Sequence, residues 1–431
     1  MNSRYTERRG KLGSMLPENT AVVIAGASTQ FRNADSSHAF RQDSNFWYLS
    51  GFNEPESTLV LLINENNAVQ SIAFVPEKDE LKEIWDGYRA GPEGAMKDHN
   101  FDLAYNNTEI NDRLPDLLAG RNQVFYPVGK SQSLDANVIE WIKTAKSKDR
   151  HSSTIDIADA SSKVGNQRLI KDTDEIETMK KACTISAEAH VEAMKFVQPG
   201  MTEQEMEAFY QYQFAKRGGR FSAYTPIIAG GENACVLHYI ENSKPLKDGE
   251  LLLVDAGCEF ELYASDITRT YPINGKFSSA QLAIYEVVLE AQVKSIEAIS
   301  TKNNVMDAQI VSEKIITQGL IDLGILNGSM EDLHAAGAFK AFYMHKIGHW
   351  LGIDVHDAGD YMEDGEFMKF KPGMITTVEP GIYISSSADV DEKWKGIGIR
   401  IEDDILVTAN GNENLTDLVP SDPKEIEALM A

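Results

Sequence analysis

The first residues that could do chemistry are two aspartates in short β-prone runs. The apolar run 251–254 ends at Asp255, and a second run, 264–271, contains Asp266. A turn near residues 259–262 would make the two aspartates cross-strand neighbours. Two facing carboxylates are destabilising unless a cation, a shared proton or water relieves them. The spacing therefore favours a metal site, with an ordinary solvated hairpin as the alternative.

A second candidate group is histidine, because three of the nine histidines fall in one short string. His345 and His349 have the i, i+4 spacing of a helical metal pair, and His356 follows them. Gly348 and Gly352 disfavour a regular helix, and no glutamate follows His345 as in the HExxH zinc motif. Any one of these histidines alone would be interpreted as structural.

Two glutamates complete the candidate set. A β-like run places Glu379 immediately before a Pro-Gly turn. Alternation in a later run places Arg400, Glu402 and Asp404 on one strand face, which is costly in a buried strand without partners. Taken singly, each run could be an edge strand with a charged face.

Together, four carboxylates and one histidine from these runs form a hard, oxygen-rich ligand set. Such a set suits manganese, magnesium, cobalt or iron, with zinc as an alternative, and it is large enough for two ions. Two ions roughly 3.5–4 Å apart can share a hydroxide that is nucleophilic near neutral pH. The set therefore predicts hydrolytic chemistry.

The elements that must position these residues fall into two parts. A chain of 431 residues favours two or three domains. The first third alternates β-rich runs such as 21–25 and 58–63 with helical stretches, which indicates an α/β domain. The chain becomes polar around 143–163, and we place the domain boundary near residue 170.

The second part begins with clear helix signals. Capping patterns begin one helix after Asp172 and the next after Thr202. Apolar residues at helical spacing predict two further helices over 279–299 and 305–323. With the β-like segments between and after them, these helices predict a mixed α and β fold (α+β) for this part.

Composition limits the partners. A formal net charge of −25 would repel phosphate backbones and anionic lipid, which argues against nucleic acid and membrane surfaces. Cys183, Cys235 and Cys258 lack CxxC spacing, so neither a disulfide framework nor a thiolate zinc site is indicated. No signal peptide and no bilayer-spanning apolar run is visible, so we expect a soluble, cytoplasmic protein.

Five residues resemble, in their order along the chain, the ligand set of the pita-bread metallopeptidases, the fold shared by methionine aminopeptidase, prolidase and aminopeptidase P: Asp255, Asp266, His349, Glu379 and Glu402. The match extends through the strings 237–239, 344–357, 378–381 and 400–404. The strings 40–55 and 83–85 resemble the N-terminal half of bacterial aminopeptidase P, which methionine aminopeptidases generally lack. The resemblance implies an N-terminal α/β creatinase-like domain over 1–170 and a C-terminal pita-bread metallopeptidase domain over 171–431.

The resemblance also implies an activity. The chain would be a metal-dependent Xaa-Pro aminopeptidase that cleaves the first bond of peptides with proline at the second position. It would hold two divalent ions per subunit, manganese first, with cobalt, zinc or iron as alternatives. Asp266 and Glu402 would bridge both ions, Asp255 would bind one, and His349 with Glu379 the other. A metal-bridging hydroxide would attack the scissile carbonyl, and Glu379 would carry a proton to the proline nitrogen.

A set of substrate-binding side chains is implied as well: His238, His345, His356, Tyr383, Arg400, Asp35 and Trp85. His345 and His356 would contact substrate carbonyls and His238 would lie beside the proline, unless these histidines orient neighbours instead. Asp35 and Trp85 would help to close the pocket, from a neighbouring subunit of a homodimer or homotetramer.

Three alternatives remain open from the sequence. Prolidase shares the ligand set but takes dipeptides only. Creatinase shares the fold without metals, and the intact ligand set argues against it. A non-catalytic binding protein on the same fold would typically have lost ligands, and here all five positions are filled.

Overall fold

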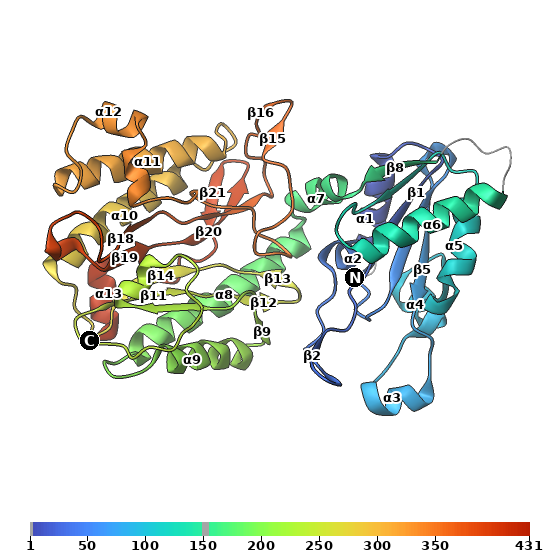
Figure 1. The fold of residues 1–431 in the computed structure, drawn as a ribbon, viewed down its shortest axis with the longest axis horizontal. Coiled ribbons are helices and arrows are strands. Elements are labelled where there is room, and N and C mark those ends of the chain that lie inside the picture. Colours follow the sequence, from blue (N-terminus) through green and yellow to red (C-terminus); the bar gives the residue numbers. More distant parts are fainter. Residues whose placement is uncertain (1–2, 149–154) are drawn as a thin grey trace. The chain divides into compact units, whose positions relative to one another are not determined.

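The computed structural model describes residues 3–148 and 155–431, and the chain divides into two compact units, Met1–Arg168 and Leu169–Ala431. Residues 149–154 of the polar stretch expected near the boundary lie outside the described residues. Each unit is described by itself (Figure 1). Within the described residues, no helix combines the length and hydropathy that crossing a bilayer would need.

The first unit is built on a six-stranded sheet of order β6-β5-β4-β1-β7-β8. Its strands are β1 Thr20–Ala25, β4 Thr58–Ile63, β5 Val69–Val75, β6 Leu103–Asn106, β7 Gln123–Tyr126 and β8 Asp156–Asp159. The β1–β4 and β4–β5 pairs are antiparallel, whereas β5–β6, β1–β7 and β7–β8 are parallel. A short hairpin, β2 Phe31–Asn33 with β3 Ser36–Ser37, lies outside this sheet.

Helices pack against this sheet because its central strands are apolar on both faces. β1 and β4 are runs of valine, leucine and isoleucine that are buried almost throughout. The helices are α1 Ser3–Ser14, α2 Ser44–Ser50, α3 Glu80–Asp86, α4 Gly91–His99, α5 Ile110–Leu118, α6 Gln132–Lys148 and α7 Ser161–Leu169. Apolar residues of α5 and α6 share one core with alternate residues of the strands, which confirms the expected α/β domain.

In the second unit, strands lie between two pairs of helices, α8 with α9 and α10 with α11 (Figure 1). The helices are α8 Thr173–Phe196, α9 Glu203–Lys216, α10 Ser279–Ala298, α11 Val305–Asp322, α12 Met330–Ala335 and α13 Pro423–Met430. The four long helices begin at capping boxes, including those at Asp172 and Thr202. The helix starts predicted from the sequence are confirmed.

The strands of this unit form several small antiparallel sheets. Three of them have three strands each, in the orders β10-β11-β14, β13-β12-β9 and β17-β20-β21, and β18 pairs with β19. Their strands are β10 Ile227–Gly230, β11 Leu251–Asp255, β14 Thr268–Pro272, β17 Ile375–Val378, β18 Gly381–Ile384, β19 Ile397–Arg400, β20 Asp403–Thr408 and β21 Gly411–Asn414. Shorter strands are β9 Phe221–Ser222, β12 Cys258–Phe260, β13 Tyr263–Ala264, β15 Met362–Glu363 and β16 Glu366–Phe367.

The strand expected over 264–271 is interrupted, which corrects one prediction. β13 ends at Ala264 and β14 begins at Thr268, so Asp255 lies opposite Thr268 rather than opposite Asp266. The expected turn does form, between β12 and β13. The ladder breaks because the backbone N–H of Asp266 donates to the Asp404 carboxylate, 3.0 Å away, instead of to a neighbouring strand.

Candidate metal centre and active site

A cavity of about 550 Å³ in the second unit gathers most of the predicted site residues. Nine of them line it: His238, Asp255, Asp266, His345, His349, His356, Glu379, Arg400 and Glu402. They come from strand ends and from the loops that follow them, which is where side chains can leave a ladder and face a common space. The cavity is the candidate active site.

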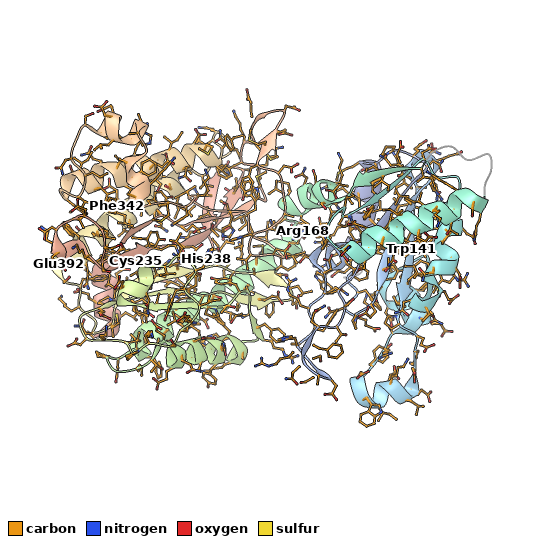
Figure 2. All side chains as sticks on the ribbon, viewed as in Figure 1. Trp141, Arg168, Cys235, His238, Phe342 and Glu392 are labelled. Carbon is orange, nitrogen blue, oxygen red and sulfur yellow. The ribbon has the colours of Figure 1, made fainter. Side chains whose placement is uncertain are left out.

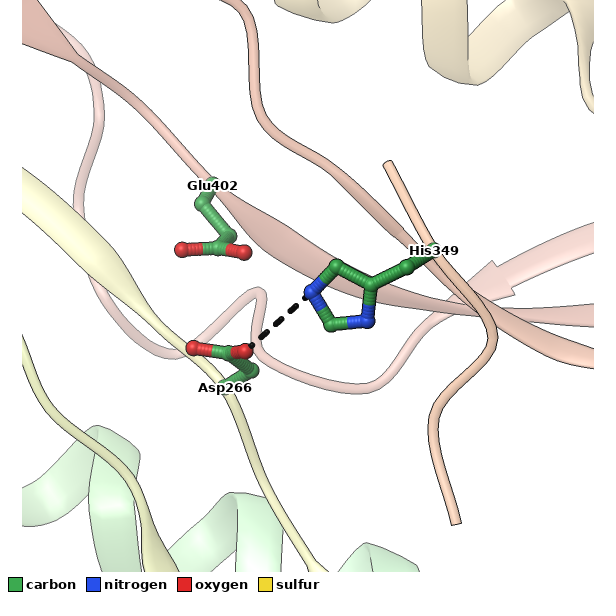
Figure 3. Close-up of side chains that lie close together, drawn as sticks. All are labelled: Asp266, His349 and Glu402. Carbon is green, nitrogen blue, oxygen red and sulfur yellow. Dashed lines mark ion pairs between the residues drawn. The ribbon is translucent and has the colours of Figure 1, made fainter. Parts of the chain in front are cut away.

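The tightest cluster in the cavity consists of Asp266, His349 and Glu402 (Figure 3). One ligand atom from each lies within 4.8 Å of the others. His349 Nε2 is 3.6 Å from Asp266 Oδ2 and 3.5 Å from Glu379 Oε1. Carboxylate oxygens and an imidazole nitrogen at this spacing fit a divalent transition ion.

His349 presents its Nε2 to this cluster because its other groups are held by the protein. The string 345–356 is not helical, as the two glycines suggested. The His349 backbone N–H donates to Thr377 Oγ1 at 3.0 Å, and its Nδ1 lies 3.1 Å from the Trp350 carbonyl. A carbonyl accepts only, so the proton is on Nδ1 and the Nε2 lone pair faces the carboxylates.

Asp255 sits at the end of β11 and is held by two donors. Arg400 Nη2 donates to its Oδ2 at 2.6 Å, and the Tyr224 hydroxyl lies 2.6 Å from its Oδ1. The same hydroxyl lies 2.5 Å from Asp266 Oδ1, so Tyr224 joins the two aspartates that the sequence had placed together. Tyr224 stands in a loop between β9 and β10, and no sequence pattern pointed to it.

Burial and like charge make the cluster electrostatically unfavourable without a cation. Burial raises the pKa of Asp266 well above the ordinary value of an aspartate, and the negative charge of Asp255 raises this pKa further. Burial likewise raises the pKa of Glu402, and the negative charge of Asp266 adds to this effect. The pKa is raised although the Glu402 carboxylate accepts a hydrogen bond from the Thr268 hydroxyl. Bound divalent ions would relieve both effects, so the residues fit the metals that the ligand set implies.

Glu379 leaves the end of β17 and shares this environment. Burial raises its pKa, while His345 and Arg400 act in the opposite direction. Its Oε1 accepts a hydrogen bond from Thr377 Oγ1 at 3.1 Å. The carboxylate is therefore oriented by Thr377 and buried beside His349.

His345 lines the cavity and belongs to a chain of hydrogen bonds that continues to Tyr383 and Arg400. Its Nδ1 donates to the Lys346 carbonyl at 2.8 Å, and its Nε2 lies 2.8 Å from the Tyr383 hydroxyl. That hydroxyl accepts from Arg400 Nη1 at 3.0 Å. Both ring nitrogens thus have protein partners, and this arrangement favours an orienting role for His345 over direct contact with substrate.

His356 and His238 face the cavity from two different loops. The His356 ring contacts that of His349 edge to face, 4.2 Å between centroids. Burial, then His349, lowers the pKa of His356, so the neutral ring is favoured. His238, labelled in Figure 2, follows the 3-10 turn Gly231–Cys235 and lies in a loop of the second unit.

Buried polar groups anchor the loops that carry these two histidines. Glu203, 0% exposed at the start of α9, accepts hydrogen bonds from four donors on the segment 230–244. Lys171 forms a 3.1 Å ion pair with Asp357, the residue after His356, and both side chains are 1% exposed. Sequence reasoning missed all three anchoring residues, because they are distant from their partners along the chain.

Asp35 and Trp85 belong to the first unit. Asp35 is exposed in the turn between β2 and β3. Trp85 is 87% exposed on α3, where Leu81 and Ile84 are exposed too. Their part in closing the pocket stays a prediction.

Two family models match the chain. The model of metallopeptidase family M24 matches residues 177–409, and that of the aminopeptidase P N-terminal domain matches residues 5–126. The chain is 43% identical to the Xaa-Pro aminopeptidase of Haemophilus influenzae over 99% of this chain and 96% of that protein. It is 41% identical to the Xaa-Pro aminopeptidase of Escherichia coli, over 99% and 97%.

Solved structures of aminopeptidase P are similar to this chain over its whole length. Aminopeptidase PepP of Pseudomonas aeruginosa has 43% identity and a TM-score of 0.96, covering 100% of this chain and 98% of that one. Zinc-substituted Escherichia coli aminopeptidase P in complex with product has 40% identity and a TM-score of 0.97, with the same coverage. These matches confirm an N-terminal α/β domain followed by a pita-bread domain. The chain therefore belongs to metallopeptidase family M24, in the aminopeptidase P (Xaa-Pro aminopeptidase) group.

Proposed function

We propose that this metallopeptidase removes the first residue of peptides whose second residue is proline, using two divalent ions. The observation that carries the proposal is the buried cluster of Asp266, Glu402 and His349, with Asp255 and Glu379 beside it. Asp266 and Glu402 would be shared by the two ions, Asp255 would complete the ligands of one ion, and His349 with Glu379 would complete those of the other. When bound, such ions acidify a water molecule and polarise the scissile carbonyl.

Manganese is the ion proposed first, because the set is rich in carboxylate oxygen. Cobalt, iron and zinc also suit carboxylate and imidazole ligands. The name of the solved Escherichia coli structure states that zinc can be substituted into that protein. Zinc is therefore included in the test below.

The chain's own residues supply proton transfer and orientation. Glu379 would take a proton from the attacking water and pass it to the proline nitrogen, which has no hydrogen of its own and leaves as a secondary amine. Arg400 orients Asp255, and through Tyr383 it also orients His345. His356 and His238 line the cavity, and a ring N–H of each can donate a hydrogen bond to a substrate carbonyl.

The setting of the enzyme is proposed from its surface. The net charge of −25 argues against binding to nucleic acid or anionic membranes, and the free cysteines Cys183, Cys235 and Cys258 support a protein that acts in the reducing cytoplasm. The exposed apolar side chains Leu81, Ile84 and Trp85 on α3 support a homo-oligomer, dimer or tetramer, in which Trp85 and Asp35 close a pocket.

The test is hydrolysis of Ala-Pro and Ala-Pro-Ala by metal-stripped protein, with manganese, cobalt or zinc added back separately. Cleavage of the tripeptide at the Ala-Pro bond, only with metal, is expected. Cleavage of the dipeptide alone would identify a prolidase. If protein that is shown to bind the ion hydrolyses neither peptide with any of the metals, a non-catalytic binding protein on this fold would be favoured.

A further inference from the structure

A second cavity, of about 510 Å³, adjoins the catalytic cavity. The two cavities share five lining side chains: His238, His345, His349, His356 and Glu379. Of the described residues that line the cavities, three carboxylates line the first but not the second: Asp255, Asp266 and Glu402. A bond cleaved beside Glu379 therefore lies where the two cavities meet.

The outer wall of the second cavity is apolar. It is formed by Val305, Met306, Ile347, Tyr361 and Phe367. Gln309 also lines it, but its carbonyl oxygen accepts from the Ile347 N–H at 2.6 Å and its amide donates to Glu313 at 3.0 Å. The Gln309 amide is thus already satisfied. Lys346 also lines the cavity, but it is exposed, so its ammonium group can stay hydrated while the apolar side chains of the wall contact an apolar ligand group.

Two elements hold this wall in place. Val305 and Met306 are the first residues of α11, whose start is capped by the Asn304 side chain. Tyr361 stacks on Trp350 with 5.0 Å between ring centroids, and its hydroxyl accepts from the Trp350 N–H. Phe367 in β16 is 42% exposed, so a ligand side chain would gain contact area there.

The distribution of charge gives the direction of a bound peptide. The carboxylates of the first cavity attract a free amino terminus, so the first residue belongs there. The proline then lies at the shared histidines, and the chain beyond it points to the second cavity. We propose that the second cavity binds the side chain of the residue after proline and selects an apolar one. This inference rests on the function proposed above.

The experiment compares Ala-Pro-Leu and Ala-Pro-Gly by kcat/KM with the manganese-loaded enzyme. Hydrophobic pockets discriminate by roughly 10–200-fold for small apolar differences, so leucine should exceed glycine by about 10-fold or more. Met306→Ala and Phe367→Ser should each reduce the leucine-to-glycine ratio toward one. Met362→Ser is the matched control, because Met362 pairs with Phe367 across the hairpin and is 44% exposed but does not line the cavity.

Equal kcat/KM for leucine and glycine would overturn the inference, as would a leucine preference that survives both cavity variants. Binding of the dipeptides Pro-Leu and Pro-Gly, measured by calorimetry, separates this result from a failure of the proposed function. If no Xaa-Pro peptide is cleaved but Pro-Leu binds more tightly than Pro-Gly, the proposed function fails and the cavity assignment stands. Equal binding of the two dipeptides contradicts the assignment.

Discussion

The second unit buries carboxylates in two different ways. Glu203 accepts hydrogen bonds from two backbone N–H groups, an asparagine amide and a tyrosine hydroxyl. Asp266 and Glu402 are buried too, but they face each other and Asp255, and burial with like charge raises the pKa of both. A carboxylate surrounded by donors stabilises a loop, whereas carboxylates that face one another require a cation.

A further buried acid, Asp403, is compensated by the protein in the way that Glu203 is. Asp403 pairs with Arg269 at 2.8 Å, and both side chains are almost fully buried. It stands next to Glu402 in the chain, yet its charge is compensated by the protein itself. Neighbouring residues can therefore serve stability and metal binding separately, and substitutions should separate the two roles.

The largest effect is expected from Asp266→Asn. The loss of a ligand should reduce metal-dependent peptidase activity by more than about 100-fold, the upper range for residues that merely orient metal ligands. Without metal, the variant should unfold at a higher temperature than the wild type at pH 8, because one of the repelling charges is gone. Activity assays and thermal unfolding of metal-stripped protein measure both effects.

The pH dependence of the metal-free wild type follows from the same shifts. The raised pKa values of Asp266 and Glu402 give stability that is present below the ordinary carboxyl pKa and is lost as pH rises through the folded-state values. Unfolding temperatures should therefore fall from pH 5 to pH 8, less so in Asp266→Asn. Asp403→Asn is the control and should lower stability at both pH values. If the metal-free Asp266→Asn protein is less stable than the wild type, the facing carboxylates do not destabilise the metal-free fold as expected.

Lys171→Met tests a buried carboxylate whose charge is compensated by a protein side chain. It leaves the buried Asp357 carboxylate without its ammonium partner, and such a loss typically costs about 3–5 kcal/mol of unfolding free energy. Urea denaturation measures it. Lys195→Met, which removes an exposed pair with Glu192, should change stability by no more than about 1 kcal/mol. Similar effects of the two substitutions would contradict the assignment of an anchoring role to Lys171.

Glu203→Gln should have a smaller effect. The amide turns one acceptor into a donor that faces other donors, at a cost of about 1–3 kcal/mol, measured by urea denaturation. Because the anchored segment carries His238, KM for Ala-Pro-Ala should rise more than kcat falls. Glu205→Gln on the same helix turn, where the capping carboxylate is exposed, is the matched control. A change in stability with no change in KM would limit Glu203 to a structural role.

Tyr224→Phe should have the smallest effect. The ring stays, but the hydroxyl between Asp255 and Asp266 is lost, so metal affinity should fall roughly 10-fold. Tyr212→Phe, at an exposed position of α9, should leave the affinity unchanged. Calorimetric titration with manganese distinguishes the two variants. Equal manganese affinities of the two variants would show that the Tyr224 hydroxyl does not support the metal ligands.

Local signals explain what the sequence predicted well. Capping boxes act within four residues, so the starts of the helices after Asp172 and Thr202 could be read directly. The four carboxylates among the predicted ligands stand beside recognisable strands or turns, His349 belongs to a short string of three histidines, and all five line the cavity. Their roles as ligands still rest on the titration proposed below.

Long-range contacts explain what was missed. The break at Asp266 depends on a hydrogen bond to Asp404, which lies far along the chain. Glu203 looked like an ordinary acid in the first turn of a helix, and Lys171 like a polar residue before one. Tyr224 stands in a loop without a motif. In each case the decisive partner comes from another part of the fold, and single-sequence patterns carry no information about it.

The most direct test of the central claim is a calorimetric titration of metal-stripped protein with manganese at pH 7.5. We expect the wild type to bind two ions per chain and to unfold at a higher temperature when loaded. Asp266→Asn should bind fewer ions and show a smaller rise in unfolding temperature. Absence of binding by the wild type, or the same stoichiometry and stabilisation in the variant, would contradict the claim that these buried carboxylates form the metal centre.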